Sequence, residues 1–267
     1  MDRYRWIWLL TDYGHRDGFV AACKGVIARI APSSQVIDIS HDVPPGNIRH
    51  GAAMLAQTVG YLPASVVVAV VDPGVGTERR GVALAAGDMV LVGPDNGLLP
   101  WAADACGGVS AAVELTEPAY RLETPALTFD GRDVFAPAAA HLAAGLPLVA
   151  LGSAISLPAL VRLPAPQTEV MPGRLQTEVL TIDHFGNVQL AAHPDHVFAA
   201  ELPPGAIQVE TAGSALRVMR GRTFADVPSG QLVLFVDSAG QLALAVNGSS
   251  AANRLRLAPG DAVTITV

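Results

Sequence analysis

The chain has 267 residues, of which 51% are hydrophobic and 15% are charged, and its formal net charge is −7. This length and composition supply enough apolar side chains for one large domain or two unequal ones. The negative charge, without any run rich in Lys or Arg, argues against a protein that binds nucleic acid or an anionic membrane surface. The expected partner is therefore a small molecule.

The first ten residues hold an apolar run of only about five residues, with no cleavage signal after it, which predicts a cytoplasmic protein. Residues 134–161 carry no charge except on His141, but proline and glycine interrupt them, so they do not predict a membrane span. Cys23 and Cys106 lack any metal-ligand spacing and are expected to be small buried hydrophobic residues in a reducing compartment.

Strand and helix patterns alternate over the first part of the chain. Apolar runs predict strands, and stripes with a period of 3.6 residues predict helices. The predicted strands are residues 6–10, 35–39, 66–71 and 89–92, and the predicted helices are residues 17–30, 47–59 and 133–144. Repeated strand–helix units predict an α/β domain over residues 1–165, with a Rossmann-like, mainly parallel sheet flanked by helices.

A proline-rich connector at residues 163–173 separates this pattern from a second one. Short alternating or apolar runs between turns then predict strands at residues 176–182, 231–236, 241–246 and 261–267. Only a short helix is expected, at residues 194–200. Residues 174–267 are therefore predicted to form a smaller antiparallel β domain that resembles a barrel.

Polar segments follow four of the predicted strands. They are TDYG at 11–14, SHD at 40–42, DPGVGTERR at 72–80 and PDNG at 94–97, and a fifth, DHFGN at 183–187, opens the second domain. Turn preferences explain any one of them. If the strands are parallel, however, four such segments meet at one sheet edge, where carboxylates among glycines suit the hydroxyl pair of a ribose.

Two other classes of site fit the sequence poorly. Gly74-Val75-Gly76 lacks the third glycine of a dinucleotide fingerprint, and the sequence has no phosphate-loop motif. The Asp and His content raises the alternative of a two-metal phosphohydrolase, which needs carboxylates and imidazoles around a bridging water. Because HExxH, HxxxH and DxH spacings are missing, no residue is predicted to bind a metal.

Eight segments together resemble one family. They are LLTDYG (9–14), KGVIARIAP (24–32), VIDISHDVPP (36–45), VVDPGVGTERR (70–80), GPDNGLL (93–99), TFDGRDVFAPAAAHLA (128–143), IDHFGNV (182–188) and AVNGSSAA (245–252). The chain resembles the adenosine-forming S-adenosyl-L-methionine (SAM) hydrolases, or SAM hydroxide adenosyltransferases, which are related to the SAM-dependent fluorinase and chlorinase. The resemblance implies a homotrimer that binds SAM as substrate, without a cofactor, between the N-terminal domain of one subunit and the C-terminal domain of the next.

The resemblance also implies a set of substrate-binding positions. They are Asp12 for the ribose hydroxyls, Asn96 and Phe129 for the pocket, Asp183 and Ser238 for the methionine ammonium and carboxylate, and Phe185, Asn187, Val246 and Gly248 for adenine.

For the chemistry, Asp72 and Arg79 match two members of the Asp-Arg-His set of the hydrolases, but Asp130 stands where those proteins have His. Asp130 is either a tolerated exchange, accepting a hydrogen bond from water or Arg79, or a change that slows, shifts or abolishes turnover. At the position of Asp72 the halogenases resemble one another in carrying Tyr. At the position of Gly131 the fluorinase looks to use a Ser. Two carboxylates would repel a halide, and Gly131 offers only its N–H.

The expected reaction is attack of water at the 5′-carbon of SAM, giving adenosine and L-methionine. Asp72 or Asp130 accepts the proton while Arg79 orients the water. The sulfonium is already a good leaving group, so no metal or organic cofactor is expected. The alternatives are a SAM-binding protein without turnover, a SAM-dependent halogenase and a metal-dependent phosphohydrolase. The sequence leaves open whether another adenosyl sulfonium is preferred.

Overall fold

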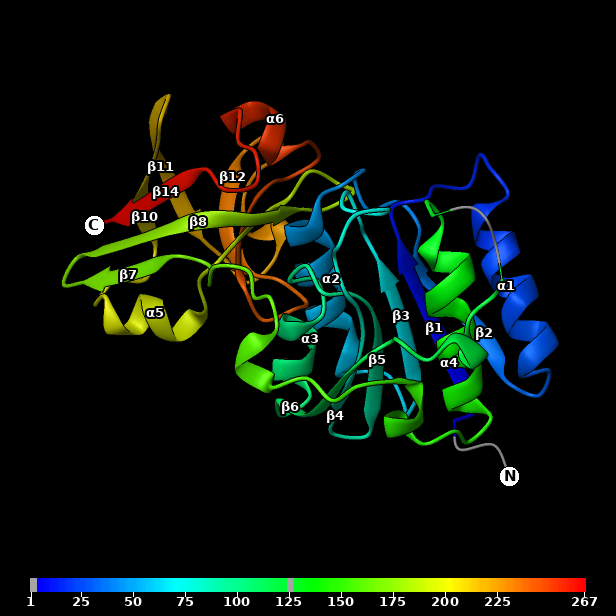
Figure 1. Cartoon of the computed structure of the whole chain (residues 1–267). Coiled ribbons are helices and arrows are strands. Elements are labelled where there is room, and N and C mark those ends of the chain that lie inside the picture. Colours follow the sequence, from blue (N-terminus) through cyan, green and yellow to red (C-terminus); the bar gives the residue numbers. More distant parts are fainter. Residues whose placement is uncertain (1–3, 124–126) are drawn as a thin grey trace. The chain divides into compact units, whose positions relative to one another are not determined.

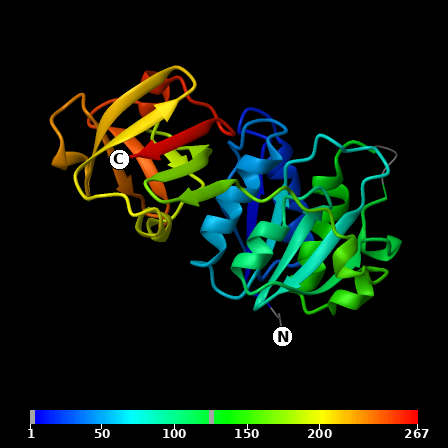
Figure 2. The ribbon, with the colours of Figure 1, turned by 90° about the vertical axis from the view of Figure 1, so that its left-hand side faces the viewer.

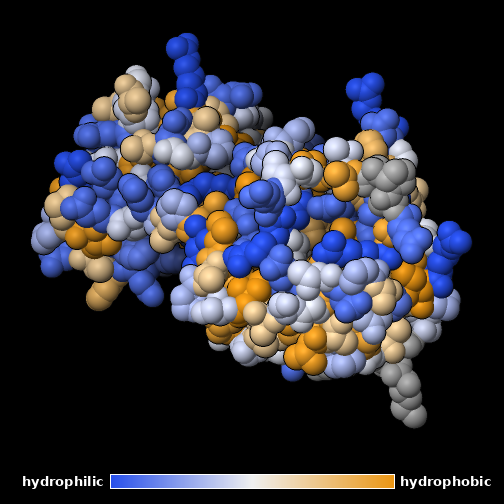
Figure 3. All heavy atoms as spheres, viewed as in Figure 1, coloured by the Kyte–Doolittle hydropathy of each residue, from blue (hydrophilic) through white to orange (hydrophobic). Residues whose placement is uncertain are grey.

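The computed structural model describes residues 4–123 and 127–267. The chain divides into two compact units, Met1–Leu163 and Pro164–Val267, coloured blue to green and green to red in Figure 1. On the face shown in Figure 3, hydrophobic residues are interspersed with hydrophilic ones, as is ordinary for globular units. Within the described part of the chain, no helix has both the length and the apolar character needed to cross a bilayer.

The N-terminal unit is built on a six-stranded sheet with the order β2-β1-β3-β5-β4-β6. Its strands are β1 (Trp6–Thr11), β2 (Gln35–Ser40), β3 (Val66–Val70), β4 (Gly81–Ala86), β5 (Met89–Pro94) and β6 (Val109–Glu114). The pairs β1–β2, β1–β3 and β3–β5 are parallel, whereas β4 runs antiparallel to both of its neighbours. The mainly parallel sheet predicted from the sequence is confirmed.

Helices cover both faces of this sheet. They are α1 (Phe19–Ile30), α2 (Ile48–Val59), α3 (Pro100–Ala105) and α4 (Ala136–Ala143). Val66, Val68 and Val70 of β3 pack into the same core as α1 and α4. Val67 and Ala69, which point to the opposite face, pack with α2 and α3. β3 is therefore buried on both faces, as its uninterrupted apolar run indicates.

The helical segment near residue 133 begins earlier than the sequence predicts. A π-helical turn at Gly131–Phe135 precedes α4, and Asp130 lies at its N-terminal boundary. Single π-helical turns often occur at functional sites, because the extra residue changes the direction of the neighbouring side chains. Short 3₁₀ turns occur at Pro118–Tyr120, Leu148–Leu151, Leu157–Ala159 and Phe224–Asp226.

The C-terminal unit is a closed barrel, as predicted. Seven strands form the ring β14-β10-β11-β12-β13-β9-β8, which the β14–β8 pairing closes, and β7 pairs with β8 outside the ring. Figure 2 shows these strands, in green to red, around a common core. All ring pairs are antiparallel except the short parallel pair β11–β12. The strands are β7 (Thr168–Met171), β8 (Arg174–Ile182), β9 (Val188–Leu190), β10 (Ala206–Thr211), β11 (Ser214–Arg220), β12 (Leu232–Val236), β13 (Leu242–Val246) and β14 (Ala262–Thr266).

Two short helices accompany the barrel. The helix α5 (Pro194–Ala199) lies where the sequence predicts one. The helix α6 (Ala251–Leu255) was not predicted, because five residues are too few to show a helical period. Ser250 caps α6 by accepting a hydrogen bond from the N–H of Asn253 at 3.1 Å.

The close packing of β5 against β3 predicts a large effect of one methyl group. A Cβ atom at Gly93 would lie 2.2 Å from the carbonyl oxygen of Ala69. We expect Gly93→Ala to lower the free energy of unfolding by about 1–3 kcal/mol, as overpacked cores do. Gly25→Ala, on an open position of α1, is the matched control and should raise that free energy by about 0.5–1 kcal/mol. Urea unfolding of both variants checks this, and equal effects would contradict it.

Candidate active site

The polar segments that follow β1 and β3 meet at one edge of the N-terminal sheet, because these strands are parallel. A third segment, just before α4, joins them. Together they enclose a cavity of about 200 Å³, called here the N-terminal cavity. Its lining residues are Asp12, Tyr13, Phe19, Val70, Asp72, Val75, Thr128, Phe129, Asp130 and Gly131. Four predicted site residues are among them: Asp12, Asp72, Phe129 and Asp130.

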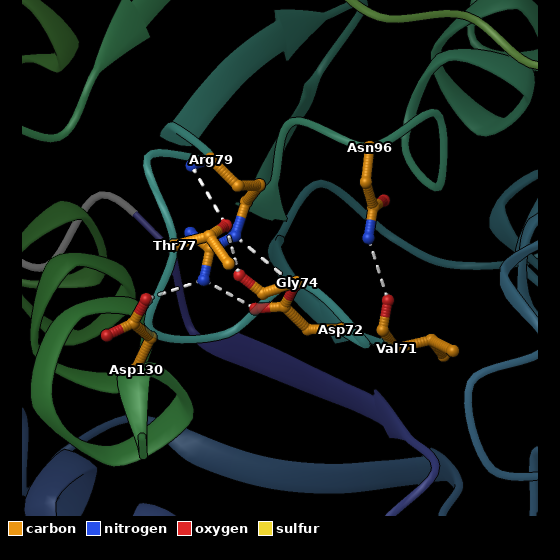
Figure 4. A network of polar contacts seen from close by, with 7 residues as sticks. All are labelled: Val71, Asp72, Gly74, Thr77, Arg79, Asn96 and Asp130. Carbon is orange, nitrogen blue, oxygen red and sulfur yellow. Dashed lines mark hydrogen bonds and ion pairs between the residues drawn. The ribbon is translucent and has the colours of Figure 1, made fainter. Parts of the chain in front are cut away.

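Arg79 joins two carboxylates at this cavity (Figure 4). Its Nε donates to Asp72 Oδ1 at 3.2 Å, and its Nη2 donates to Asp72 Oδ2 at 2.5 Å. The same Nη2 donates to Asp130 Oδ2 at 2.5 Å. The guanidinium carbon also lies 5.5 Å from the ring centre of Phe135. We call these three residues the carboxylate–arginine cluster; the sequence predicted all three as catalytic, and the structure brings them together.

A compact turn returns the chain from Asp72 to Arg79. The hydroxyl of Thr77 donates to the carbonyl of Gly74 at 2.7 Å and accepts from the N–H of Arg79 at 3.3 Å. Gly76 has φ +80°, and a Cβ there would lie 3.3 Å from the carbonyl oxygen of Leu127. The glycines and the threonine of this segment therefore give Arg79 the position from which it reaches back to Asp72.

The two carboxylates of the cluster differ in how deeply they are buried. The Asp72 side chain is 5% exposed and that of Asp130 is 24% exposed. Burial raises the pKa of Asp72, Arg79 lowers it and the charge of Asp130 raises it, and the result is a pKa above the usual Asp value. A carboxylate held in this way is a better proton acceptor than a solvated one.

Three aromatic rings wall the cavity. The ring centres of Tyr13 and Phe129 are 5.8 Å apart, and those of Phe19 and Phe129 are 5.2 Å apart. Phe19 and Cys23 are four residues apart in α1 and share one stripe of that helix; Cys23 is buried, but Phe19 is 46% exposed and lines the cavity. Phe19 was not predicted as a site residue, because the helical period alone does not distinguish a core position from a cavity wall. Tyr13 lies in the polar segment TDYG but was not predicted as a site residue either.

Tyr13 and Gly131 fit each other closely. A Cβ at position 131 would lie 2.1 Å from the Tyr13 hydroxyl oxygen, so glycine leaves room for that hydroxyl where a larger residue would displace it. Burial raises the pKa of Tyr13, and the nearby carboxylates raise it further, so the phenol is neutral at physiological pH.

Two other polar residues, Asn96 and Arg80, make contacts within the protein. Asn96 donates from Nδ2 to the carbonyl of Val71 at 2.8 Å, which fixes the residue before Asp72, and Asn96 is not among the described residues that line the cavity. Arg80 makes an ion pair with Asp95 at 2.5 Å. A substrate contact of Asn96 stays a prediction.

The C-terminal unit has a cavity of its own, of about 430 Å³, called here the C-terminal cavity. Its lining residues are Phe185, Asn187, Phe224, Val246, Asn247, Gly248, Ser249 and Ser250. The four positions that the resemblance assigns to adenine, Phe185, Asn187, Val246 and Gly248, all lie there. Phe224 was not predicted; its ring packs edge-on against Phe235, with ring centres 5.0 Å apart.

Asp183 holds the turn that presents Phe185. Its Oδ1 accepts from the N–H of Phe185 at 2.9 Å and of Asn187 at 2.8 Å, and its Oδ2 accepts from Asn187 Nδ2 at 2.7 Å. A Cβ at Gly186 would lie 2.2 Å from the Ser250 hydroxyl oxygen, so the turn packs tightly on the start of α6. The Phe185 side chain is 77% exposed as a result.

Ser238 lies in a second exposed turn of the C-terminal unit, which Asp237 holds through the N–H groups of Ala239 and Gln241. The roles of Asp183 and Ser238 toward the methionine part of a substrate stay predictions. No group of three or more His, Cys, Asp or Glu side chains suited to a metal ion occurs in residues 4–123 and 127–267.

The fold and site define a two-unit class, in which an α/β unit carries a carboxylate–arginine cavity and a barrel carries an aromatic one. Family models of the SAM hydroxide adenosyltransferase N-terminal and C-terminal domains match residues 7–152 and 177–264, and the chain belongs to this family. It is 56% identical over 266 residues to the (R)-S-adenosyl-L-methionine hydrolase of Salinispora arenicola (strain CNS-205), covering 98% of this chain and 97% of that protein.

Two further comparisons extend this result. The chain is 30% identical over 286 residues to the fluorinase of Actinopolyspora mzabensis, with 96% of this chain and 95% of that protein covered. The crystal structure of an uncharacterized conserved protein from Thermotoga maritima superposes with a TM-score of 0.91 at 34% identity, covering 98% of this chain and all of that one. The resemblance stated from the sequence is confirmed.

The raised pKa of Asp72 predicts how stability changes with pH. The folded chain keeps this proton above about pH 3.9, where the unfolded chain loses it. Stability from this group is therefore present below that pH and is lost as pH rises through the folded-state pKa. We expect the free energy of unfolding of Asp72→Asn, relative to the natural chain, to increase over that window. Urea unfolding at a series of pH values measures it, with Asp104→Asn as the exposed control; a constant difference would refute the assignment.

Proposed function

We propose that the protein hydrolyses SAM to adenosine and L-methionine. The observation that carries the proposal is the carboxylate–arginine cluster on the wall of the N-terminal cavity. The hydrolase names of relatives such as that of Salinispora arenicola support it. Those names specify an (R) form. Because the L descriptor already fixes the amino acid carbon, the (R) descriptor refers to the sulfonium. The proposed substrate is therefore SAM with the (R) configuration at sulfur.

In the proposed reaction, a water oxygen forms a bond to the 5′-carbon as the bond from that carbon to sulfur breaks. The sulfur keeps the electron pair and leaves as the neutral thioether of methionine, and Asp72 accepts the proton of the water. Fixing water in line with the breaking bond is worth on the order of 7–11 kcal/mol when the geometry is good. Arg79 keeps the buried carboxylate of Asp72 ionised and oriented.

Asp130 is proposed to be a working replacement for histidine. Its Oδ2 accepts from Arg79, so its carboxylate is fixed beside the cavity and its other oxygen can accept a hydrogen bond from the attacking water. Asp12, Asp72 and Asp130 give the cavity wall three carboxylates against one guanidinium. That charge favours a sulfonium and disfavours chloride or fluoride as nucleophile.

The two cavities are proposed to be two halves of one type of site, completed in a homotrimer by the N-terminal unit of one subunit and the C-terminal unit of the next. The aromatic C-terminal cavity supplies a stacking surface for adenine, with Phe185 exposed at its edge. No metal or organic cofactor takes part in the proposed reaction. The free thiols Cys23 and Cys106 suit a reducing compartment, and we propose the cytoplasm.

The first test is incubation of the purified protein with SAM. We expect adenosine and methionine, with yields unaffected by chelator, and no 5′-chloro-5′-deoxyadenosine in the presence of chloride. We also expect faster turnover of the (R) sulfonium epimer than of the (S). Chromatography of the nucleosides and an assay of methionine give the answer. Unchanged SAM together with measurable binding, and turnover gained in Asp130→His, would instead indicate a SAM-binding protein.

Asp72→Asn tests the proton acceptor. We expect kcat to fall by about 100-fold or more, because the amide cannot take the proton, whereas KM changes little. In the natural chain kcat/KM should rise with pH through an apparent pKa above the usual Asp value, and the variant should lose this dependence. Asp104→Asn, which removes a surface carboxylate paired with Arg162, is the control. Full activity of Asp72→Asn would remove Asp72 from the mechanism.

A mixing experiment tests the shared site. Asp72→Asn disables the N-terminal cavity and Phe185→Ala the C-terminal cavity, so each variant alone should be nearly inactive. When the two are co-expressed, subunits should combine at random and about a quarter of the sites should have both cavities intact. Recovery of activity in the mixture supports sites between subunits, whereas an inactive mixture of trimers would show that each site lies within one chain.

A further inference from the structure

The polar segment SHD at residues 40–42 lies at the end of β2 and is not among the described residues that line either cavity. It nevertheless contains a buried imidazole, that of His41. The His41 side chain has no exposed surface. Its Nδ1 lies 2.7 Å from the Thr11 hydroxyl, and its Nε2 lies 3.0 Å from Asp38 Oδ1. Asp38 Oδ2 in turn accepts from Lys24 Nζ at 2.7 Å. A continuous chain of polar contacts thus runs from the surface to the end of β1.

The Thr11 hydroxyl links His41 to the backbone of Tyr13. Its oxygen accepts from the N–H of Tyr13 at 3.2 Å and lies 2.7 Å from His41 Nδ1. With the hydroxyl proton donated to Nδ1, the imidazole carries its proton on Nε2, which faces the carboxylate of Asp38.

This series of polar contacts ends at the segment that carries Asp12. Besides the bond from Tyr13 to the Thr11 side chain, the N–H of Gly14 donates to the carbonyl of His41 at 2.8 Å. The N–H of Gly46, farther along the same loop, donates to Asp12 Oδ2 at 2.8 Å. The backbone on one side of Asp12 and one of its carboxylate oxygens are therefore both fixed by the loop that follows β2, while Asp12 lines the N-terminal cavity.

We propose that His41, through Thr11, is a positioning residue for Asp12, and that this hydrogen-bond chain sets the orientation of the carboxylate that binds the substrate ribose. His41 does not touch the substrate. It fixes the Thr11 side chain, whose oxygen accepts from the N–H of Tyr13. The inference rests on the proposed function, since it takes the ribose as the group that Asp12 holds.

The test combines Thr11 and Asp12 variants in a double-mutant cycle on the full-length protein. Thr11→Val keeps the shape and strand preference of the residue but removes the hydroxyl. We expect it to lower kcat/KM for SAM by up to about 100-fold, which is the scale of a misplacement near 1 Å. In an Asp12→Ala background the same change should alter kcat/KM by no more than about twofold, because the residue it positions is gone. Thr11→Ser, which restores the hydroxyl, should restore most of the activity.

Thr58→Val is the matched control, since the Thr58 hydroxyl bonds only within α2, to the carbonyl of Met54 at 2.8 Å, away from the chain. It should leave kcat/KM unchanged in both backgrounds. Equal losses from Thr11→Val in the two backgrounds would overturn the proposal, because a merely structural role weakens both alike. Unchanged activity of Thr11→Val would overturn it as well.

A second measurement needs no variant. The nitrogen-15 chemical shifts of the imidazole in the natural chain should show His41 as the neutral tautomer protonated at Nε2, and the tautomer protonated at Nδ1 would contradict the proposed chain. These outcomes are separable from failure of the proposed function. If the natural chain forms no adenosine from SAM, hydrolysis is refuted, and the tautomer together with Asp12-dependent SAM binding still tests the positioning chain.

Discussion

The sharing of one guanidinium between two carboxylates is the constraint on which the site depends. Asp72 and Asp130 both accept from Nη2 of Arg79, so the guanidinium ties the positions of the two carboxylates together. Without Arg79, the buried carboxylate of Asp72 would lose its partner, which is strongly destabilising. Its net charge is negative when both acids are ionised. A cationic ligand would therefore balance the charge of the cavity, and the sulfonium of SAM carries such a charge.

The scaffold makes that arrangement rigid. The central strand β3 packs on both faces, against α1 and α4 on one side and against α2 and α3 on the other, so the position of Asp72 directly beyond it follows from two separate cores. The loops then differ in function. The turn from Asp72 to Arg79 forms the cluster, Asn96 supports it through the carbonyl of Val71, and the loop after β2 fixes Asp12. The geometry of the cavity wall thus depends in part on residues that do not line the cavity.

Much of this organisation follows from local sequence signals. The four parallel strands show as apolar runs, and the polar segments after them indicate a ligand site without further information. The strands β4 and β6 were missed, since Gly81–Ala86 and Val109–Glu114 are rich in alanine and give little strand signal. The departure of Phe19 from its helical stripe, the close fit of Tyr13 to Gly131, and the link from His41 to Thr11 are long-range contacts. They depend on how distant segments pack, and no spacing within one segment encodes them.

The fit of Tyr13 to Gly131 also limits how such a site can change over evolutionary time. A side chain at position 131 would place its first carbon 2.1 Å from the tyrosine oxygen, so a serine there requires the tyrosine ring to shift. A lineage that moves from water toward a halide as nucleophile, with a hydroxyl donor at this position, must therefore move the tyrosine or exchange it for a shorter residue. Sterics thus couple the residues at positions 13 and 131 in any change between the two chemistries.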